Sequence, residues 1–218
     1  MANKIQMIAY KDKDFLVVEK PPFLNTEELI GQIKKEFSGA ESVHRLDTNT
    51  SGLLIVALNP ETKKYFQEQF QKGLIEKKYL ALVKNHLIKK QGMIDYPLVK
   101  VGAKHISLTS PRKQFEKQIQ RQALTYYKVL NNNDDFALLE VSPKTGRTHQ
   151  IRSHLSAINH YIIGDYRYGP KKQPLETERY FLHAYFLRFK TLNSQEIKLE
   201  SKLPEDLLNI LKTAKLTF

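Results

Sequence analysis

Ser42-Val43-His44-Arg45-Leu46-Asp47-Thr48-Asn49-Thr50-Ser51-Gly52, followed by the apolar run from Leu53 to Leu58, is the stretch that says most about this chain. The apolar run is typical of a buried strand, and the Thr-Ser-Gly segment before it is typical of a turn. Arg45 and Asp47 therefore stand where a strand begins. Polar residues on a loop held by a rigid scaffold often carry function. An isolated Arg-x-Asp is nevertheless more often a surface pair that caps a turn.

Two other motifs are similar to this stretch, and both fail. His-Arg-Leu-Asp is close to a kinase catalytic loop, but the chain contains no Gly-rich phosphate loop and no Asp-Phe-Gly. Asp47, Asn49, Ser51 and Gly52 match the first half of a calcium loop. Leu58 stands where that loop needs a bidentate Glu, and the flanks favour strands over helices. Calcium binding is therefore not expected.

The composition favours a polyanionic partner. The 218 residues include 35 Lys and Arg against 23 Asp and Glu, a net charge of +12, which suits nucleic acid or anionic lipid. The absence of cysteine excludes disulfide bonds and thiolate zinc sites. The sequence shows neither an apolar signal region nor a stretch long enough to span a membrane, so we expect a cytoplasmic protein.

The order of the predicted elements indicates an α+β fold with a largely antiparallel mixed sheet flanked by helices. Hydrophobic alternation predicts strands at 5–10, 15–19, 53–58, 78–83, 123–130, 136–141, 181–192 and 196–200. Helices are expected at 25–37, from Asn59-Pro60 to Gly73, at 148–157 and from Pro204 onward. No repeat or Pro/Gly-rich linker divides the chain, so we expect one catalytic domain over residues 1–218.

Three helix starts carry cap signals. Asn25 and Glu28 form a capping-box pattern, Asn59 precedes a Pro at the first helical position, and Thr148 suits an N-cap.

The interval from Gly102 to Arg121 has poor periodicity and five Lys or Arg against one Glu. It is expected to be a basic loop, which would serve either in binding or as a solvated connection.

A second polar cluster runs from Pro143 to Leu155 and leads into the third helix. Arg147 stands just before that helix and can point back at the sheet. His149 and His154 lie five residues apart, on different helix faces, so a zinc site is rejected. A carboxylate that must stay ionised in a partly buried site needs a bidentate cation, and Arg meets that need better than Lys.

Taken together, the motifs resemble the RluA-type RNA pseudouridine synthases. The resemblance rests on His44-Arg45-Leu46-Asp47 with Thr50-Ser51-Gly52-Leu53-Leu54, on Lys77-Lys78-Tyr79-Leu80-Ala81, and on Thr145-Gly146-Arg147-Thr148-His149-Gln150-Ile151-Arg152. Lys20-Pro21-Pro22, Gly164-Asp165, Tyr168-Gly169 and Leu182-His183-Ala184 fit as well. The chain departs from the family pattern at Phe23-Leu24-Asn25-Thr26 and at Tyr161. These departures concern the entrance of the expected cleft and not the catalytic chemistry. We expect no N-terminal S4-type RNA-binding domain.

The resemblance implies roles for particular residues. Asp47 matches the family's essential aspartate, Arg147 the arginine that pairs with it, and Tyr79 the tyrosine stacked on the uracil. Arg45 matches the residue that replaces the extruded base in the stack. The residues expected to bind substrate beside a central catalytic cleft are His44, Arg45, Thr50, Ser51, Arg152 and Leu182.

The reaction implied is the isomerisation of specific uridines in structured ribosomal or transfer RNA, without cofactor or metal, by a monomer. Two other classes stay open. A catalytically silent RNA-binding protein or chaperone would explain the charge but would not require Asp47, Tyr79 and Arg147 together. A hydrolytic nucleosidase using Asp47 lacks the second carboxylate that water activation usually needs.

Overall fold

The structure is a computed structural model that describes residues 7–87, 89–110, 115–116 and 118–218. The chain forms two compact units. Unit 1 contains Met1–Lys77 and His183–Lys202, and unit 2 contains Lys78–Leu182 and Leu203–Phe218. Both combine a mostly antiparallel sheet with helices, which confirms the predicted α+β class. Among the described residues no helix has the length and apolar character needed to cross a membrane.

Unit 1 is built on a sheet whose strands follow the order β1 (Ile8–Lys11), β2 (Phe15–Lys20), β4 (Ser51–Ala57) and β11 (Leu182–Lys190). β3 (Glu41–Ser42) pairs with β4, and β12 (Glu196–Glu200) pairs with β11. The pairing of β4 with β11 is parallel, and the other pairings are antiparallel.

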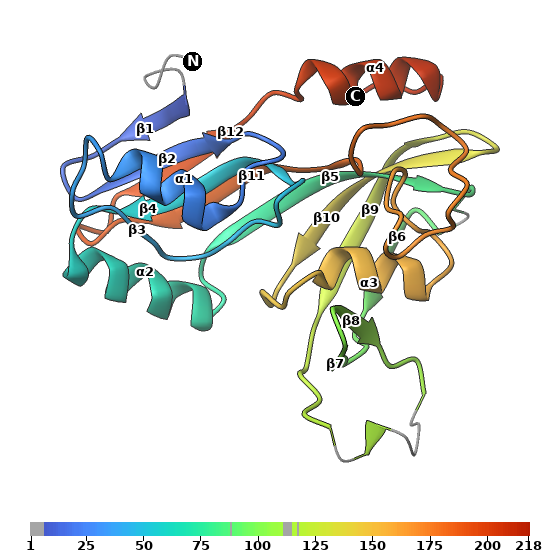
Figure 1. Ribbon diagram of the computed structural model, residues 1–218, viewed down its shortest axis with the longest axis horizontal. Coiled ribbons are helices and arrows are strands. Elements are labelled where there is room, and N and C mark those ends of the chain that lie inside the picture. Colours follow the sequence, from blue (N-terminus) through green and yellow to red (C-terminus); the bar gives the residue numbers. More distant parts are fainter. Residues whose placement is uncertain (1–6, 88, 111–114, 117) are drawn as a thin grey trace. The chain divides into compact units, whose positions relative to one another are not determined.

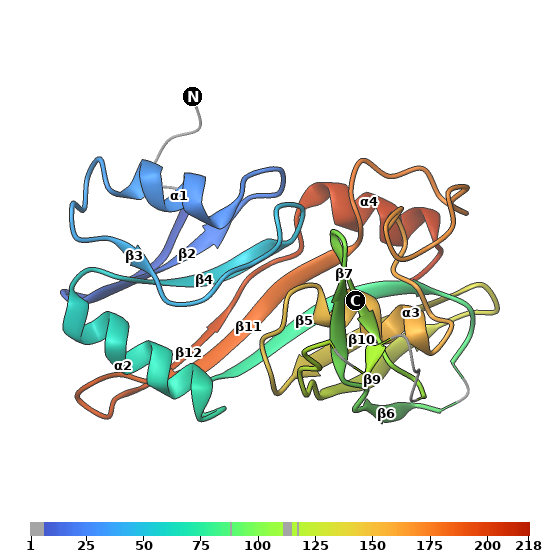
Figure 2. The same ribbon diagram turned by 60° about the horizontal axis from the view of Figure 1, so that its bottom comes forward.

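Both faces of this sheet are covered, which explains why β2 and β4 are almost continuously apolar. Phe15 and Val17 of β2 pack with Phe66 of α2 (Pro60–Gln71). Leu16 and Val18 point to the other face, where they line an apolar pocket together with side chains of α1 (Thr26–Ile33). Figure 2 shows the two helices on opposite sides of the strands. The alternation follows from the two-residue period of a strand.

Unit 2 is built on antiparallel strands in the order β5 (Glu76–Lys84), β10 (Phe136–Pro143), β9 (Thr125–Asn132) and β6 (Gln91–Ile94). Helix α3 (Gln150–Ala157) packs on β9 and β10, and α4 (Glu205–Thr213) follows Pro204 near the C-terminus (Figure 1). The buried guanidinium of Arg179 binds Asp206 of α4 at 2.6 Å.

The expectation of a basic loop from Gly102 to Arg121 is wrong for the first part of that interval. Lys104–Ser107 form strand β8, which pairs with β7 (Leu98–Val101). Gly102, with a φ of +57°, provides the left-handed turn between the two strands. Val99, Leu108 and Phe115 form a small core of their own. Residues 111–114 and 117 lie outside the described residues.

The cap signals of the first two helices are confirmed. The Asn25 side chain accepts from the Glu28 amide, and the Glu28 side chain accepts from the Asn25 amide. The Asn59 side chain caps α2 by accepting from the amide of Thr62. Gly73 follows the end of α2 with a φ of +67°, the left-handed conformation common just after a helix.

Candidate active site

Asp47 lies in a tight turn between β3 and β4. The backbone carbonyl of Asp47 accepts a hydrogen bond of 3.0 Å from the amide of Thr50, which closes the turn. The Asp47 side chain is half-buried, Arg45 is exposed, and Thr50 and Ser51 are buried. The turn therefore presents a carboxylate and a guanidinium on the end of a fully buried strand.

Lys20, the last residue of β2, holds this turn in place through the hydrogen bonds of its side chain. Its side chain is 1% exposed, and its ammonium group donates to the carbonyls of Pro21 and Leu24, each at 2.7 Å, and of Thr48 at 2.9 Å. A buried ammonium is tolerated because its three donors find acceptors. The Lys-Pro-Pro motif thus ties the β2–α1 segment to the residue next to Asp47.

Thr26 makes a second tie between the same two segments. Its buried hydroxyl accepts from the Leu46 amide and donates to the Leu46 carbonyl, both at 3.2 Å. The two neighbours of Asp47, Leu46 and Thr48, are therefore held by the start of α1 and by the end of β2. Such double attachment limits the motion of the catalytic candidate.

Ser51 and Gly52 join the turn to β11. Ser51 Oγ lies 2.9 Å from His183 Nδ1, in a register that also pairs Gly52 with Ala184. Gly52 has a φ of +114°, and a Cβ at this position would meet the carbonyl oxygen of Ala184. Only glycine lets the two backbones approach this closely.

His44 is partly buried in unit 1. Its Nε2 accepts from the Ile55 amide at 2.9 Å, and its ring lies 4.4 Å from the Phe70 ring. Burial, assisted by the nearby charge of Lys77, lowers the pKa of His44 to about 3. His44 is therefore neutral at physiological pH, with its proton on Nδ1. The expectation that His44 binds substrate stays a prediction.

The depressed pKa of His44 predicts a pH effect on stability. Between pH 6.5, the usual pKa of an unfolded His, and about pH 3, the unfolded chain binds a proton that the folded chain does not. The contribution of neutral His44 is therefore complete above pH 6.5 and is lost as the pH falls, by up to about 1.4 kcal/mol per pH unit. Urea unfolding between pH 7 and 4 measures this slope.

His44→Gln keeps an acceptor for the Ile55 amide but cannot titrate, so its acid slope should be smaller than that of the wild type. His86→Gln, which changes an exposed histidine, is the matched control and should keep the wild-type slope. Equal slopes in all three proteins would show that His44 titrates normally.

Tyr79, Arg147, Arg152 and Leu182 belong to unit 2. Tyr79 lies on β5 opposite Val141 of β10 and is 8% exposed. Leu182 is buried at the start of β11. The side chain of Arg147 is exposed, and its Nε donates to the Gln122 carbonyl at 3.1 Å. The assignment of Tyr79 and Arg147 to one site with Asp47 stays a prediction.

Helix α3 begins differently from expectation. The N-cap is His149, in the left-handed conformation with a φ of +56°, and not Thr148. No side chain caps this helix, but Gln150 braces the turn before it: its Oε1 accepts from the Arg147 amide at 3.0 Å and from the Thr145 hydroxyl at 2.7 Å. These bonds fix the backbone of Arg147.

Arg152 has an internal carboxylate partner. Its guanidinium binds Asp165 through two bonds, of 2.6 and 2.9 Å, and both side chains are almost fully buried. The guanidinium also lies over the rings of Tyr168 and Tyr180, 5.1 and 4.2 Å from their centres. The expectation that Arg152 binds substrate stays a prediction, but this geometry gives Arg152 a structural function.

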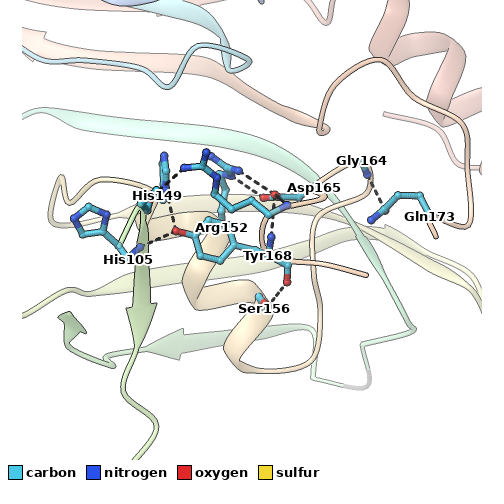
Figure 3. A network of polar contacts seen from close by, with 10 residues as sticks. His105, His149, Arg152, Ser156, Gly164, Asp165, Tyr168 and Gln173 are labelled. Carbon is cyan, nitrogen blue, oxygen red and sulfur yellow. Dashed lines mark hydrogen bonds and ion pairs between the residues drawn. The ribbon is translucent and has the colours of Figure 1, made fainter. Parts of the chain in front are cut away.

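Tyr168 extends this network toward β8 (Figure 3). Its hydroxyl accepts from the His105 amide at 3.0 Å and lies 2.9 Å from His149 Nδ1. Burial, the largest influence, raises the pKa of Tyr168, so the phenol stays protonated. Because the hydroxyl oxygen accepts from His105, its proton is available for Nδ1 of His149. The network links the N-cap of α3 with the β7–β8 hairpin.

His154 has a structural environment. Its Nδ1 lies 2.9 Å from the Thr125 hydroxyl and its Nε2 lies 2.9 Å from the Tyr96 carbonyl. The sequence motifs contain Lys20, Asp165 and Tyr168, but the motifs alone assign these residues no role in the site. A lysine that ends an otherwise apolar strand was a usable signal, because such an amine must find buried acceptors.

Comparison with known proteins identifies the family. Residues 7–157 match the family model described as RNA pseudouridylate synthase. The dual-specificity RNA pseudouridine synthase RluA of Yersinia pestis is 34% identical over 188 residues, covering 82% of this chain and 89% of that protein. The ribosomal large subunit pseudouridine synthase C of Rickettsia typhi is 32% identical over 218 residues, covering 94% of this chain and 71% of the relative.

A solved structure of the same family has a similar fold. Human RNA Pseudouridylate Synthase Domain Containing 4 superposes with a TM-score of 0.81 at 25% identity, over 98% of this chain and 95% of the human chain. An α+β chain with Asp47 on a fixed turn thus falls in the class of RNA-modifying isomerases. The chain belongs to the RNA pseudouridylate synthase family, whose members convert uridine in RNA to pseudouridine.

Proposed function

We propose that this protein isomerises specific uridines in structured RNA to pseudouridine, with Asp47 as the essential carboxylate. The observation that carries the proposal is the family match over residues 7–157, which includes the Asp47 turn and the segments of Tyr79 and Arg147. One relative is named a dual-specificity RNA pseudouridine synthase, and another is named a pseudouridine synthase of the ribosomal large subunit. Ribosomal or transfer RNA is therefore the proposed substrate class.

The reaction breaks the bond between C1′ and N1 of the uridine, turns the base, and joins C5 to C1′. Asp47 acts either as a nucleophile on C1′ or as the base that removes a 2′ proton. In both routes positive charge develops on the ribose, and an ionised carboxylate at the sugar stabilises that charge. The half-buried turn suits this use, since Lys20 and Thr26 hold its backbone in place.

Three further side chains have proposed roles. Arg147 pairs with Asp47, Tyr79 stacks on the uracil and assists C5 deprotonation, and Arg45 fills the gap left by the extruded base. Arg147 and Arg45 are exposed in the free protein, so we expect RNA to cover both on binding. The excess of 12 positive charges adds attraction to RNA that falls steeply with salt.

We further propose that the enzyme is a cytoplasmic monomer with one catalytic domain.

The proposal for the activity is tested with RNA labelled with tritium at uridine C5, prepared from cells that lack this protein. Each pseudouridine formed releases one C5 tritium to water. Tritium release by the wild type is the expected result. RNA binding without tritium release would instead indicate the catalytically silent RNA-binding protein.

Arg147 is expected to matter more for turnover than for folding. A charge-assisted hydrogen bond contributes about 2 kcal/mol, so Arg147→Ala should lower kcat/KM roughly thirtyfold. The free energy of unfolding should change little, because the side chain is exposed. Arg147→Lys keeps the charge but loses bidentate geometry and should recover only part of the activity. Arg167→Ala, another exposed arginine of unit 2, is the control. Unchanged kinetics of Arg147→Ala would remove Arg147 from the mechanism.

Tyr79→Phe tests the hydroxyl separately from the ring. If the hydroxyl assists C5 deprotonation, the variant should bind RNA normally and cleave the glycosidic bond, yet release tritium at least about a hundredfold more slowly. Quenched reactions analysed for a detached but unrearranged base check this expectation. Tyr127→Phe is a suitable control, because Tyr127 is also a buried strand tyrosine of unit 2. Wild-type tritium release by Tyr79→Phe would leave only the stacking role.

A further inference from the structure

Phe23 stands out in unit 1 because its conformation and its exposure are both unfavourable for a phenylalanine. Its φ is +64°, in the left-handed region that favours glycine, and its side chain is 54% exposed. It follows Pro22, and a proline followed by a residue of positive φ is typical of a type II turn. In such a turn the residue directly after the proline is normally Gly or Asn. Backbone strain of this kind persists where the surrounding structure over-determines it, and often at functional sites.

The segment that carries Phe23 is attached directly to the Asp47 turn. The carbonyls of Pro21 and Leu24, on either side of Phe23, and the carbonyl of Thr48 all bind the same ammonium group, that of Lys20. Three residues after Phe23, the Thr26 hydroxyl binds the backbone of Leu46. The exposed ring is therefore presented from a backbone that is fixed to both neighbours of Asp47.

The local charges indicate which part of an RNA this ring would contact. Glu27 and Glu28, in the first turn of α1, are exposed and acidic. Carboxylates at this place repel phosphate groups, whereas the face of a nucleobase is uncharged. Aromatic rings on a rigid platform bind nucleobases by stacking, in single-stranded or splayed segments of RNA.

We propose that Phe23 is a substrate-binding residue that stacks on an unpaired nucleobase next to the target uridine. This inference rests on the proposed function, because it takes Asp47 as the place of the target. Phe23 contributes to binding in the ground state and the transition state equally, so it acts on KM and leaves kcat unchanged. A base in a single-stranded or splayed segment near the target has no stacking partner of its own, and Phe23 offers that base one.

The first experiment compares Phe23→Gly with the wild type on C5-tritiated RNA from cells that lack this protein. Loss of the stacking contact should lower kcat/KM about tenfold through KM, with kcat within about twofold. Phe23→Tyr keeps the ring and should stay within about twofold of the wild type. Leu74→Ala, which shortens a residue of unit 1 that is 61% exposed, is the matched control and should change neither constant.

The second readout is stability, which separates loss of the ring from misfolding. Glycine adopts the left-handed conformation without steric strain, which offsets the larger entropy that a glycine loses on folding, so the thermal unfolding midpoint of Phe23→Gly should equal or exceed that of the wild type. Weaker RNA binding together with an unchanged or higher midpoint is the result that supports the proposal.

A third readout tests stacking without catalysis. A single-stranded oligouridylate with one 2-aminopurine is titrated with each protein, and stacking on an aromatic ring quenches its fluorescence. Quenching should persist in Asp47→Asn and Phe23→Tyr and be lost in Phe23→Gly. Wild-type kinetics and quenching in Phe23→Gly would overturn the inference, as would a loss confined to kcat. Absence of tritium release by the wild type would overturn the proposed function instead, while the fluorescence titration still reports on the ring.

Discussion

Asp47→Asn is expected to reduce tritium release from C5-labelled RNA by roughly a thousandfold or more, to background. Asparagine has the size of aspartate but carries no charge and is a poor nucleophile and base, so it can serve neither proposed route at C1′ or the 2′ proton. The turn itself should survive, because it is held by the Asp47 carbonyl and by Lys20, and neither contact uses the Asp47 carboxylate. RNA affinity and the free energy of unfolding should therefore stay close to wild type.

The matched control for this experiment is Asp134→Asn, which removes an exposed carboxylate from the β9–β10 turn. It changes the net charge by the same amount, so any general electrostatic effect on RNA binding appears in both variants. Substantial tritium release by Asp47→Asn would rule out the proposed mechanism. Loss of activity accompanied by unfolding would show instead that the carboxylate supports the turn.

Arg152→Met is expected to lower the free energy of unfolding by about 3–5 kcal/mol. The substitution keeps an apolar stem of similar length but leaves Asp165 without its bidentate partner, and an unpaired buried charge is costly. Asp165 is 1% exposed, and its Oδ1 also accepts from the amides of Arg167 and Tyr168, so the loop around it depends on the same carboxylate. Urea unfolding at constant pH measures the loss.

Two further variants show how much of the stability loss in Arg152→Met comes from the buried ion pair. Asp135→Asn breaks the surface pair with Lys84 and should cost less than about 1 kcal/mol. Replacing both Arg152 and Asp165, by Met and Leu, removes both charges and should recover part of the stability lost in the single variant. If Arg152 served RNA binding alone, Arg152→Met would raise KM and leave the unfolding curve unchanged.

Local signals in the sequence determined much of the fold. The capping box at Asn25 and the cap at Asn59 predicted the starts of α1 and α2, because both depend on side-chain contacts three residues apart. The hairpins β1–β2 and β9–β10 followed from alternation interrupted by polar turns. The end of α1 was predicted four residues too late, at Phe37 and not Ile33, because periodicity alone gives no stop signal there.

The Asp47 turn was also visible in the sequence. Its place before a buried strand and its match to a family motif are local properties, and the chemistry proposed for Asp47 follows from them. The β7–β8 hairpin was missed, because its four-residue strands are short and its small core joins Val99 to Phe115, 16 positions later. Contacts over such separations leave no periodic trace.

The motifs identify several polar residues, but only the tertiary structure shows which partners their side chains contact. Lys20 meets the Thr48 carbonyl 28 residues away, Ser51 meets His183 at a separation of 132, and Arg152 meets Asp165 from a different element. Each of these polar groups is buried and must find a partner, and the fold decides which one lies within reach. The sequence by itself determined which residues have the chemistry for the reaction. The tertiary structure decided which polar groups hold the backbone around Asp47 and around the start of α3, because burial makes every such bond obligatory.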